Sequence, residues 1–472
     1  MKFGTDGWRA IIARDFTYDN VRICAQAVAD YLRESGITDK GLVIGYDTRF
    51  ASEDFAAAAA EVVAGNDIKV YLSPSPIPTP IVSYSVIAKQ TGGAIVITAS
   101  HNPPAWNGIK FKTSDGAGAP GHVTQEIEKY IGQINTLDDV KSIPLTEAIR
   151  KGLIEYLDMF PIYRRHVEAL LDLGGLRRSN LKIVIDPMYG TSQGYLKSLI
   201  EGGTLDITEI HNERNPLFPG LYPEPIPPHI TELTEAVKRL KADVGVATDG
   251  DGDRMGIVDE NGNYVPIVQV FALLALYLLE IRGEKGLIVK TVNATNMLYT
   301  LGDMHGVTVR ETPVGFKYIA EIMLDKNENV LIGGEESGSF GYEKHMPERD
   351  GIFSILCFLD LMVRTEKTPS QLIDYLFSKV GPHYYDRIDI DFPESERQWI
   401  IDRVINNPPC EIQGMKVKKY DTFDGYKYTL TDDSWLLIRF SGTEPLLRIY
   451  TESTSPERVE DLLRIGRGIA GV

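Results

Sequence analysis

Short apolar runs rich in β-branched residues alternate with longer amphipathic or alanine-rich runs through most of the chain. The short runs predict strands and the long runs predict helices, an order typical of α/β domains with largely parallel sheets. Strands are predicted at residues 41–46, 94–98, 181–185, 243–247, 287–289 and 330–332. Helices are predicted at residues 18–34, 53–64, 230–240 and 268–281.

The C-terminal part of the chain follows a different pattern. Strands are predicted at residues 387–390, 426–431, 435–440 and 446–450, joined by turns, with helices at 394–406 and 456–468. Strands that follow one another through turns pair antiparallel, and the helices then cover one face. This part is therefore predicted to be an α+β domain.

The length of 472 residues suggests about three or four domains. Candidate boundaries are the polar stretch 135–142, the turn at 259–263 and the region 365–369. The predicted domains are residues 1–140, 141–260, 261–368 and 369–472.

Charge and cysteine content narrow the possible functions. The chain has 49 Lys and Arg against 66 Asp and Glu, a net charge of −17. Nucleic acids and anionic membranes select basic surfaces, so neither is an expected partner. Three cysteines at distant positions indicate neither a disulfide framework nor a zinc site. The N-terminus lacks an apolar signal-peptide core, and the expected location is the cytoplasm.

Four loops dense in Gly, Ser, Asp, Glu and Arg each follow a predicted strand, about one in each predicted domain. Ligands of α/β sheets bind outside the carboxyl ends of the strands. We therefore expect the four loops to line one cleft.

The first loop, residues 98–103, contains Ser100 and His101, with Lys110 downstream. A serine beside an imidazole and an ammonium is a candidate nucleophile. An Asn-Pro turn with a serine cap is the structural alternative. No Gly-x-Ser-x-Gly elbow surrounds Ser100, which disfavours an α/β-hydrolase.

The second loop, residues 249–254, alternates aspartate with glycine, so that Asp249, Asp251 and Asp253 can converge on a hard cation. An EF-hand is excluded because Arg254 occupies the position that needs glycine and both flanks are predicted strands. Three carboxylates with room for a phosphate oxygen favour Mg²⁺ over Ca²⁺. A solvated Asp-Gly turn is the alternative.

The third and fourth loops offer groups for a sugar and a phosphate. In residues 333–338, the carboxylate and hydroxyl side chains of Glu335, Glu336 and Ser337 suit sugar hydroxyls, which both donate and accept, although an exposed acidic turn would look the same. The fourth loop suits a phosphate dianion, or is a hairpin with surface arginines. Its candidate ligands are Arg439, Ser441, the N–H of Gly442, Thr443 and Arg448. Together the four loops indicate phosphoryl transfer on a sugar phosphate.

These motifs allow the chain to be compared with a known family. F-G-T-D-G-W-R at residues 3–9, T-A-S-H-N-P at 98–103 and D-G-D-G-D-R at 249–254 occur in order with the other two loops. The set resembles the α-D-phosphohexomutase superfamily, which includes phosphoglucomutase and phosphomannomutase. The resemblance implies four domains around a central cleft: three similar α/β domains with mixed sheets, then a TATA-binding-protein-like α+β domain.

The resemblance also implies roles for individual residues. Ser100 would carry the phosphoryl group, and its phosphate oxygen would bind Mg²⁺ with the three aspartates. The reaction would interconvert hexose 1-phosphate and 6-phosphate through a hexose 1,6-bisphosphate. Arg9, His101 and Lys110 would surround the transferring group, and either His101 or Lys110 would handle the hydroxyl proton. The remaining substrate ligands would be Arg254, Lys317, Glu335, Ser337, Arg439, Ser441, Gly442, Thr443 and Arg448.

The sugar is predicted from two positions. Glu336 stands where glucosamine enzymes have Gln, and Phe316 stands where the bifunctional mannose and glucose enzymes have His. Both favour glucose, with mannose possible and a phosphoglucosamine mutase as the alternative. A Mg²⁺-dependent sugar phosphatase and a non-catalytic sugar-phosphate-binding protein are the rivals from other classes. The expected partner is a small-molecule sugar phosphate.

Overall fold

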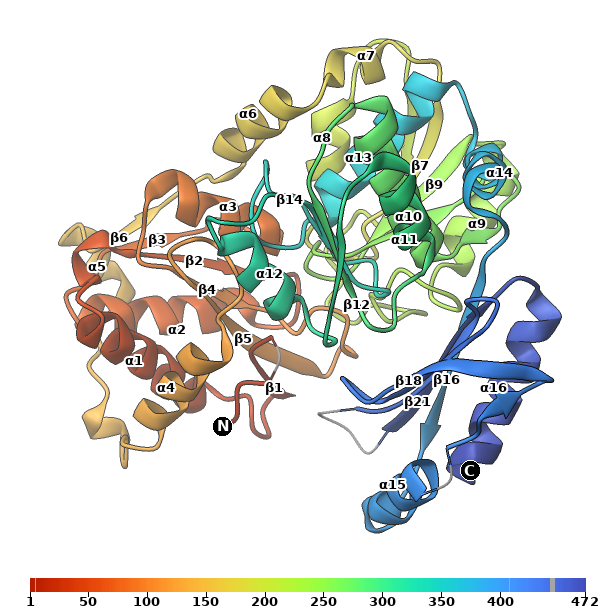
Figure 1. Ribbon diagram of the computed structural model, residues 1–472. Coiled ribbons are helices and arrows are strands. Elements are labelled where there is room, and N and C mark those ends of the chain that lie inside the picture. The colour runs from red at the N-terminus through yellow and green to blue at the C-terminus, as the bar shows by residue number, and fades with distance from the viewer. Residues whose placement is uncertain (5, 407, 442–445) are drawn as a thin grey trace.

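The computed structural model describes residues 1–4, 6–406, 408–441 and 446–472 (Figure 1). Its four sheets mark four domains, and the predicted fold class is confirmed. The first sheet has the order β1-β5-β4-β2-β3-β6, in which β5 runs antiparallel to both of its neighbours and the strands from β4 to β6 in this order pair parallel. Its strands are β1 (Trp8–Ile11), β2 (Leu42–Tyr46), β3 (Val70–Leu72), β4 (Ala94–Ile97), β5 (Trp106–Lys112) and β6 (Ile154–Tyr156). Its helices are α1 (Tyr18–Glu34), α2 (Ser52–Gly65), α3 (Thr79–Lys89), α4 (Gly121–Ile131) and α5 (Leu145–Arg150).

The second and third sheets are also mixed, with orders β11-β10-β9-β7-β8 and β13-β12-β14-β15. The second contains β7 (Lys182–Asp186), β8 (Asp206–Glu209), β9 (Val244–Thr248), β10 (Met255–Val258) and β11 (Tyr264–Val265). The third contains β12 (Leu287–Thr291), β13 (Val309–Thr312), β14 (Val330–Gly334) and β15 (Phe340–Gly341). Their helices are α6 (Phe160–Leu170), α7 (Leu173–Arg177), α8 (Tyr195–Ile200), α9 (Thr231–Leu240), α10 (Ile267–Leu276), α11 (Met297–His305), α12 (Phe316–Leu324), α13 (Gly351–Thr365) and α14 (Pro369–Val380).

One strand order recurs in all three domains. If the strands of each domain are numbered along the chain from β2, β7 or β12, each sheet contains the same order, fourth-third-first-second. The corresponding strands are β5-β4-β2-β3, β10-β9-β7-β8 and β15-β14-β12-β13. In each domain a loop joins the third of these strands to an antiparallel fourth. Those loops are the first three predicted from the sequence, so the repeat places them at equivalent positions.

The fourth domain is an antiparallel sheet in the order β16-β21-β20-β19-β18-β17. Its helices lie together on one side of the sheet (Figure 1), and both contribute to its separate apolar core. The strands are β16 (Tyr384–Asp391), β17 (Glu411–Ile412), β18 (Met415–Asp421), β19 (Tyr426–Leu430), β20 (Trp435–Phe440) and β21 (Leu446–Ser453), and the helices are α15 (Arg397–Asn406) and α16 (Pro456–Ala470).

Strand pairing and packing extend each of the first three domains beyond its predicted end. β6 pairs with β3, so the first sheet continues past residue 140. β11 pairs with β10 beyond residue 260, and α14 packs on α10 and α11 beyond residue 368. The polar segments that suggested boundaries are loops inside domains. Among the described helices, none is long and apolar enough to cross a membrane.

Candidate active site

Ser100 lies in the loop between β4 and β5, where its backbone has a φ of 52°. Its Oγ donates a hydrogen bond of 2.7 Å to Oδ2 of Asp249 and lies 3.4 Å from Nδ1 of His101. Its N–H donates to Oγ1 of Thr98 at 2.9 Å. A non-glycine residue in the left-handed region is strained and persists only where its surroundings hold it.

Arg49 holds this loop in place and was not predicted. Its Nη1 donates to the carbonyl oxygens of Pro103 (2.9 Å) and Trp106 (3.0 Å). Its Nη2 donates to those of Ser100 and Asn102, both at 2.6 Å. The side chain is fully buried, so no water molecule could donate hydrogen bonds to these carbonyls in place of the guanidinium. One guanidinium therefore shapes the whole loop.

The three predicted aspartates converge in the loop between β9 and β10. Carboxylate oxygens of Asp249, Asp251 and Asp253 lie within 4.8 Å of one another, and all three side chains are buried. Among the described residues, Oδ1 of Asp251 and Oδ1 of Asp253 have no hydrogen-bond partner. Buried carboxylate oxygens without partners are costly, and a hard cation would satisfy them. The donor set fits Mg²⁺.

Burial and neighbouring charge shift the pKa values of two of these carboxyls in opposite directions. Burial and the adjacent Asp251 and Asp253 raise the pKa of Asp249 well above its usual value. Burial also opposes ionisation of Asp251, but the ammonium of Lys110 at 2.8 Å lowers its pKa overall. Such divergence is typical of functional sites.

Lys110 is a fixed cation in this arrangement. Its Nζ lies 2.7 Å from Asp6, 2.8 Å from Asp251 and 3.3 Å from Asp253. Burial alone would lower the pKa of Lys110, but the three carboxylates raise it. In contrast, burial and then Arg254 and Arg9 lower the pKa of His101 well below its usual value.

Arg349 and Asp6 complete the cluster, and neither was a predicted site residue. Nη2 of Arg349 lies 2.6 Å from Asp6 and 2.9 Å from Asp253, so groups from the first three domains meet at one guanidinium. Of the predicted arginines, Arg9 donates to Oδ1 of Asn102 at 2.6 Å, while the backbone N–H of Arg254 donates to Oδ1 of Asp249 at 3.1 Å.

The third loop follows β14 and lies against the second. The N–H of Met255 donates to the carbonyl oxygen of Gly338 at 3.0 Å. Glu335 is buried and accepts a 3.0 Å hydrogen bond from the N–H of Gly315, and burial raises its pKa to about 7. Ser337 donates to Ser339 at 3.2 Å.

The fourth loop is only partly described. Nε of Arg439 lies 3.0 Å from Asp424, and Nε of Arg448 lies 3.6 Å from Asp389. The predicted ligands Gly442 and Thr443 lie outside the described residues, while Ser441 is buried at the end of β20. Lys317 is the second residue of α12, with its Nζ 5.1 Å from the ring centre of Tyr318.

Comparison with known proteins agrees with this arrangement. Models of the phosphoglucomutase/phosphomannomutase family match residues 1–138 (alpha/beta/alpha domain I), 161–262 (domain II), 268–380 (domain III) and 409–464 (C-terminal domain). A phosphoglucomutase/phosphomannomutase from Thermococcus kodakarensis is 30% identical over 464 residues, covering 98% of this chain and 97% of that protein. This chain belongs to the phosphoglucomutase/phosphomannomutase family.

Other relatives are named as mutases of different sugar phosphates. A protein from Methanothermobacter thermautotrophicus named "Probable phosphoglucosamine mutase" is 31% identical over 470 residues, 99% of this chain and 97% of that one. A crystal structure from Thermus thermophilus, provisionally named a phosphomannomutase, superposes with a TM-score of 0.87 at 34% identity, covering 100% and 99% of the two chains. This member of the phosphohexomutase family is an intramolecular phosphotransferase, as predicted.

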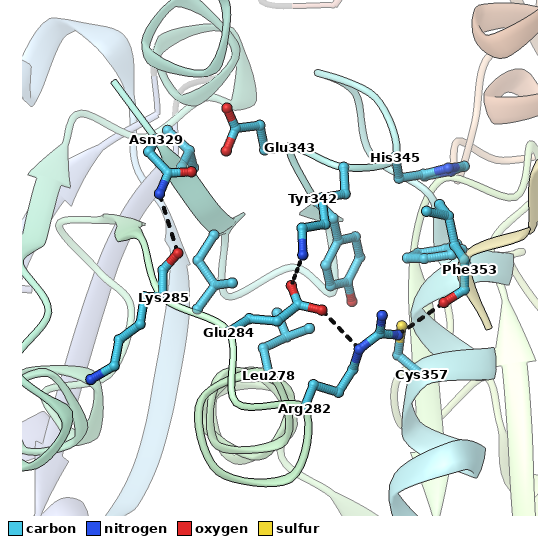
Figure 2. Close-up of a pocket in the computed structure, with 14 residues that line it drawn as sticks. Leu278, Arg282, Glu284, Lys285, Asn329, Tyr342, Glu343, His345, Phe353 and Cys357 are labelled. Atoms are coloured by element: carbon cyan, nitrogen blue, oxygen red, sulfur yellow. Dashed lines mark hydrogen bonds and ion pairs between the residues drawn. The ribbon is translucent and has the colours of Figure 1, made fainter. Parts of the chain in front are cut away.

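A separate pocket of this family member lies between the helical turn that follows α10 (Tyr277–Ile281), the segment after β15, and α13 (Figure 2). Arg282 and Glu284 form an ion pair of 2.8 Å in its lining, and Cys357 lies beside the end of the Arg282 side chain. None of the predicted site residues lines this pocket. It is therefore distinct from the candidate active site.

Proposed function

We propose that this enzyme interconverts hexose 1-phosphate and hexose 6-phosphate, with glucose preferred, through phosphorylated Ser100 and a hexose 1,6-bisphosphate. The observation that carries the proposal is the 2.7 Å hydrogen bond from Ser100 Oγ to Asp249, beside Oδ1 of Asp251 and Oδ1 of Asp253, which have no hydrogen-bond partner in the described part of the chain. The three aspartates and an oxygen of the phosphorylated serine would hold Mg²⁺. When bound, Mg²⁺ offsets the charge on the transferring phosphoryl group.

The other residues would orient the substrate and neutralise its charge. Arg9, His101 and Lys110 would surround the transferring group, because phosphoryl transfer depends on positioning and charge stabilisation more than on covalent chemistry. Glu335 and Ser337 would bind sugar hydroxyls. The second phosphate would be held by Arg439, Ser441, Gly442, Thr443 and Arg448. Arg254 and Lys317 would also bind the substrate, with Lys317 contacting a phosphate or donating a proton. The bisphosphate has to turn end for end, so this site would accept either of its phosphates.

The preferred sugar is a separate part of the proposal. Glu336 and Phe316 favour glucose, and dual use with mannose is consistent with the phosphoglucomutase/phosphomannomutase relative. The name of the Methanothermobacter relative makes a phosphoglucosamine mutase the second candidate. We expect glucose 1-phosphate to give the highest kcat/KM when glucose, mannose and glucosamine 1-phosphates are compared under one set of conditions. A clear preference for glucosamine 1-phosphate would select the second candidate.

The reaction itself is tested by Ser100→Ala. Intact mass spectrometry of the wild type should show one added phosphoryl group, absent from the variant. Formation of glucose 6-phosphate in a coupled assay should fall by about 10³-fold or more, as when other enzymes lose a nucleophile. Chelation of Mg²⁺ should also abolish activity, and added Mg²⁺ should restore it.

Ser75→Ala, at an exposed serine of the same domain, is the matched control. A wild type that is phosphorylated at Ser100 but releases only inorganic phosphate would instead be a phosphatase. A folded, Mg²⁺-loaded wild type with neither phosphoserine nor product would be a binding protein.

A further inference from the structure

Each arginine of the proposed phosphate site in the fourth domain lies beside an aspartate. Nε of Arg439 is 3.0 Å from Oδ2 of Asp424, and Nε of Arg448 is 3.6 Å from Oδ2 of Asp389. The two arginines are direct neighbours across β20 and β21. Like charges at opposed positions of neighbouring strands repel. The aspartates therefore offset a positive charge that would otherwise be concentrated here.

Asp424 also contacts the third domain. Its Oδ2 accepts a hydrogen bond of 2.7 Å from the N–H of Val314. The next residue, Gly315, donates its N–H to Glu335, which we assign to the sugar. One carboxylate oxygen thus connects the arginine proposed to bind phosphate with the segment that supports the sugar-binding loop.

We infer that Asp424 is a positioning residue that pairs with Arg439 when no phosphate is bound and competes with phosphate for it. The inference rests on the proposed function, in which Arg439 binds the second phosphate. A phosphate dianion is a stronger acceptor for a guanidinium than one carboxylate, so phosphate displaces Asp424. The competition weakens the hold on phosphate, which favours release of the bisphosphate for its turn.

Asp424→Asn tests this directly, because asparagine keeps an oxygen for the N–H of Val314 but loses the charge. Inorganic phosphate is the probe, with its inhibition constant measured in the coupled assay beside KM for glucose 1-phosphate. We expect both constants to fall by about 1.5- to fivefold, the range for loss of one partly exposed charge pair. A purely structural role would leave phosphate binding unchanged or weaken it.

Two further variants test whether the change in phosphate binding depends on the pair of Asp424 and Arg439. Asp421→Asn, in the adjoining part of β18, where Asp421 pairs with Lys419 at 2.6 Å, should leave both constants unchanged. In an Arg439→Ala background, Asp424→Asn should no longer tighten phosphate binding. Phosphate binding by Asp424→Asn that equals the wild type or is weaker would overturn the inference. Absence of hexose phosphate isomerisation by the wild type would overturn the proposed function instead.

Discussion

Two buried carboxyls in this site differ in their pKa because their neighbours differ. Asp251 has the ammonium of Lys110 at 2.8 Å, and this contact outweighs the cost of burying its charge. Glu335 is also buried, and desolvation outweighs the attraction of Arg349, so its pKa rises to about 7. The residue type alone does not set the charge of either group near neutral pH.

Glu335→Gln should therefore change how stability depends on pH. The pKa of Glu335 is raised from 4.5 to about 7, so the folded chain retains a proton that the unfolded chain loses in this range. The contribution of Glu335 to wild-type stability then falls as pH rises from 4.5 to 7, by up to about 3 kcal/mol, and levels off above it. The glutamine variant lacks this contribution.

Thermal midpoints measured from pH 5 to 8 will check this expectation. The midpoint of Glu335→Gln should rise relative to the wild type as the pH approaches 7. Glu321→Gln, at an exposed position on α12 of the same domain, controls for loss of a carboxylate. If the thermal midpoints of wild type and Glu335→Gln differed by the same amount at every pH, the expectation would be contradicted.

At the scale of elements, the loop between β4 and β5 depends on the loop between β2 and α2. Arg49 in the second loop donates to four carbonyl oxygens of the first, including that of Ser100. Asp47 lies 3.1 Å from Nε of Arg49 and fixes the guanidinium. The phenyl ring of Phe218, from the proline-rich segment of the second domain, lies 5.1 Å from the guanidinium carbon. The conformation of Ser100, the proposed nucleophile, is thus set by a buried cation.

Arg49→Lys should lower kcat while KM changes little. Lysine keeps the charge, but its single ammonium cannot reproduce a planar fork that bonds four carbonyls. A displacement of Ser100 by about 1 Å is enough to cost roughly 10²-fold in rate. Steady-state kinetics with glucose 1-phosphate measures the effect, and Arg14→Lys, at an exposed arginine, is the control. A kcat equal to that of the wild type would show that Ser100 does not need this support.

At the scale of the whole molecule, buried ion pairs join the domains. Nζ of Lys112 on β5 lies 2.5 Å from Glu348 of the third domain, and both side chains are fully or almost fully buried. Arg349, next in the chain, reaches Asp6 and Asp253. The first, second and third domains therefore meet through charged groups next to the three aspartates that we propose to hold Mg²⁺.

Lys112→Met should destabilise this junction. Removing one partner of a buried pair costs about 3–5 kcal/mol, because the remaining charge loses its partner. Differential scanning calorimetry should show a lower thermal midpoint. Lys151→Met breaks a surface pair of 2.7 Å with Glu147, which water screens, and should lower the midpoint much less. Equal shifts for the two variants would mean that the buried pair has no special role.

Local patterns predicted much of this protein. The strands before the four loops follow from short apolar runs, and Asp249, Asp251 and Asp253 are close in sequence, so one tight turn suffices to bring them together. The Ser100 loop and the family resemblance likewise depend on contiguous motifs. Such features are encoded within a few neighbouring residues and can be recognised without knowledge of the fold.

Long-range pairing decided the rest. Nothing near Arg49 indicates that it binds a loop 51 residues away, and Arg349 is 343 residues from Asp6. The place of β6 in the first sheet depends on its partner β3, not on its own sequence. The amino-acid sequence by itself determined the chemical groups, the loops that carry them and the family. Only the tertiary structure decided which buried charges face each other, because desolvation and Coulomb energy depend on distances between domains.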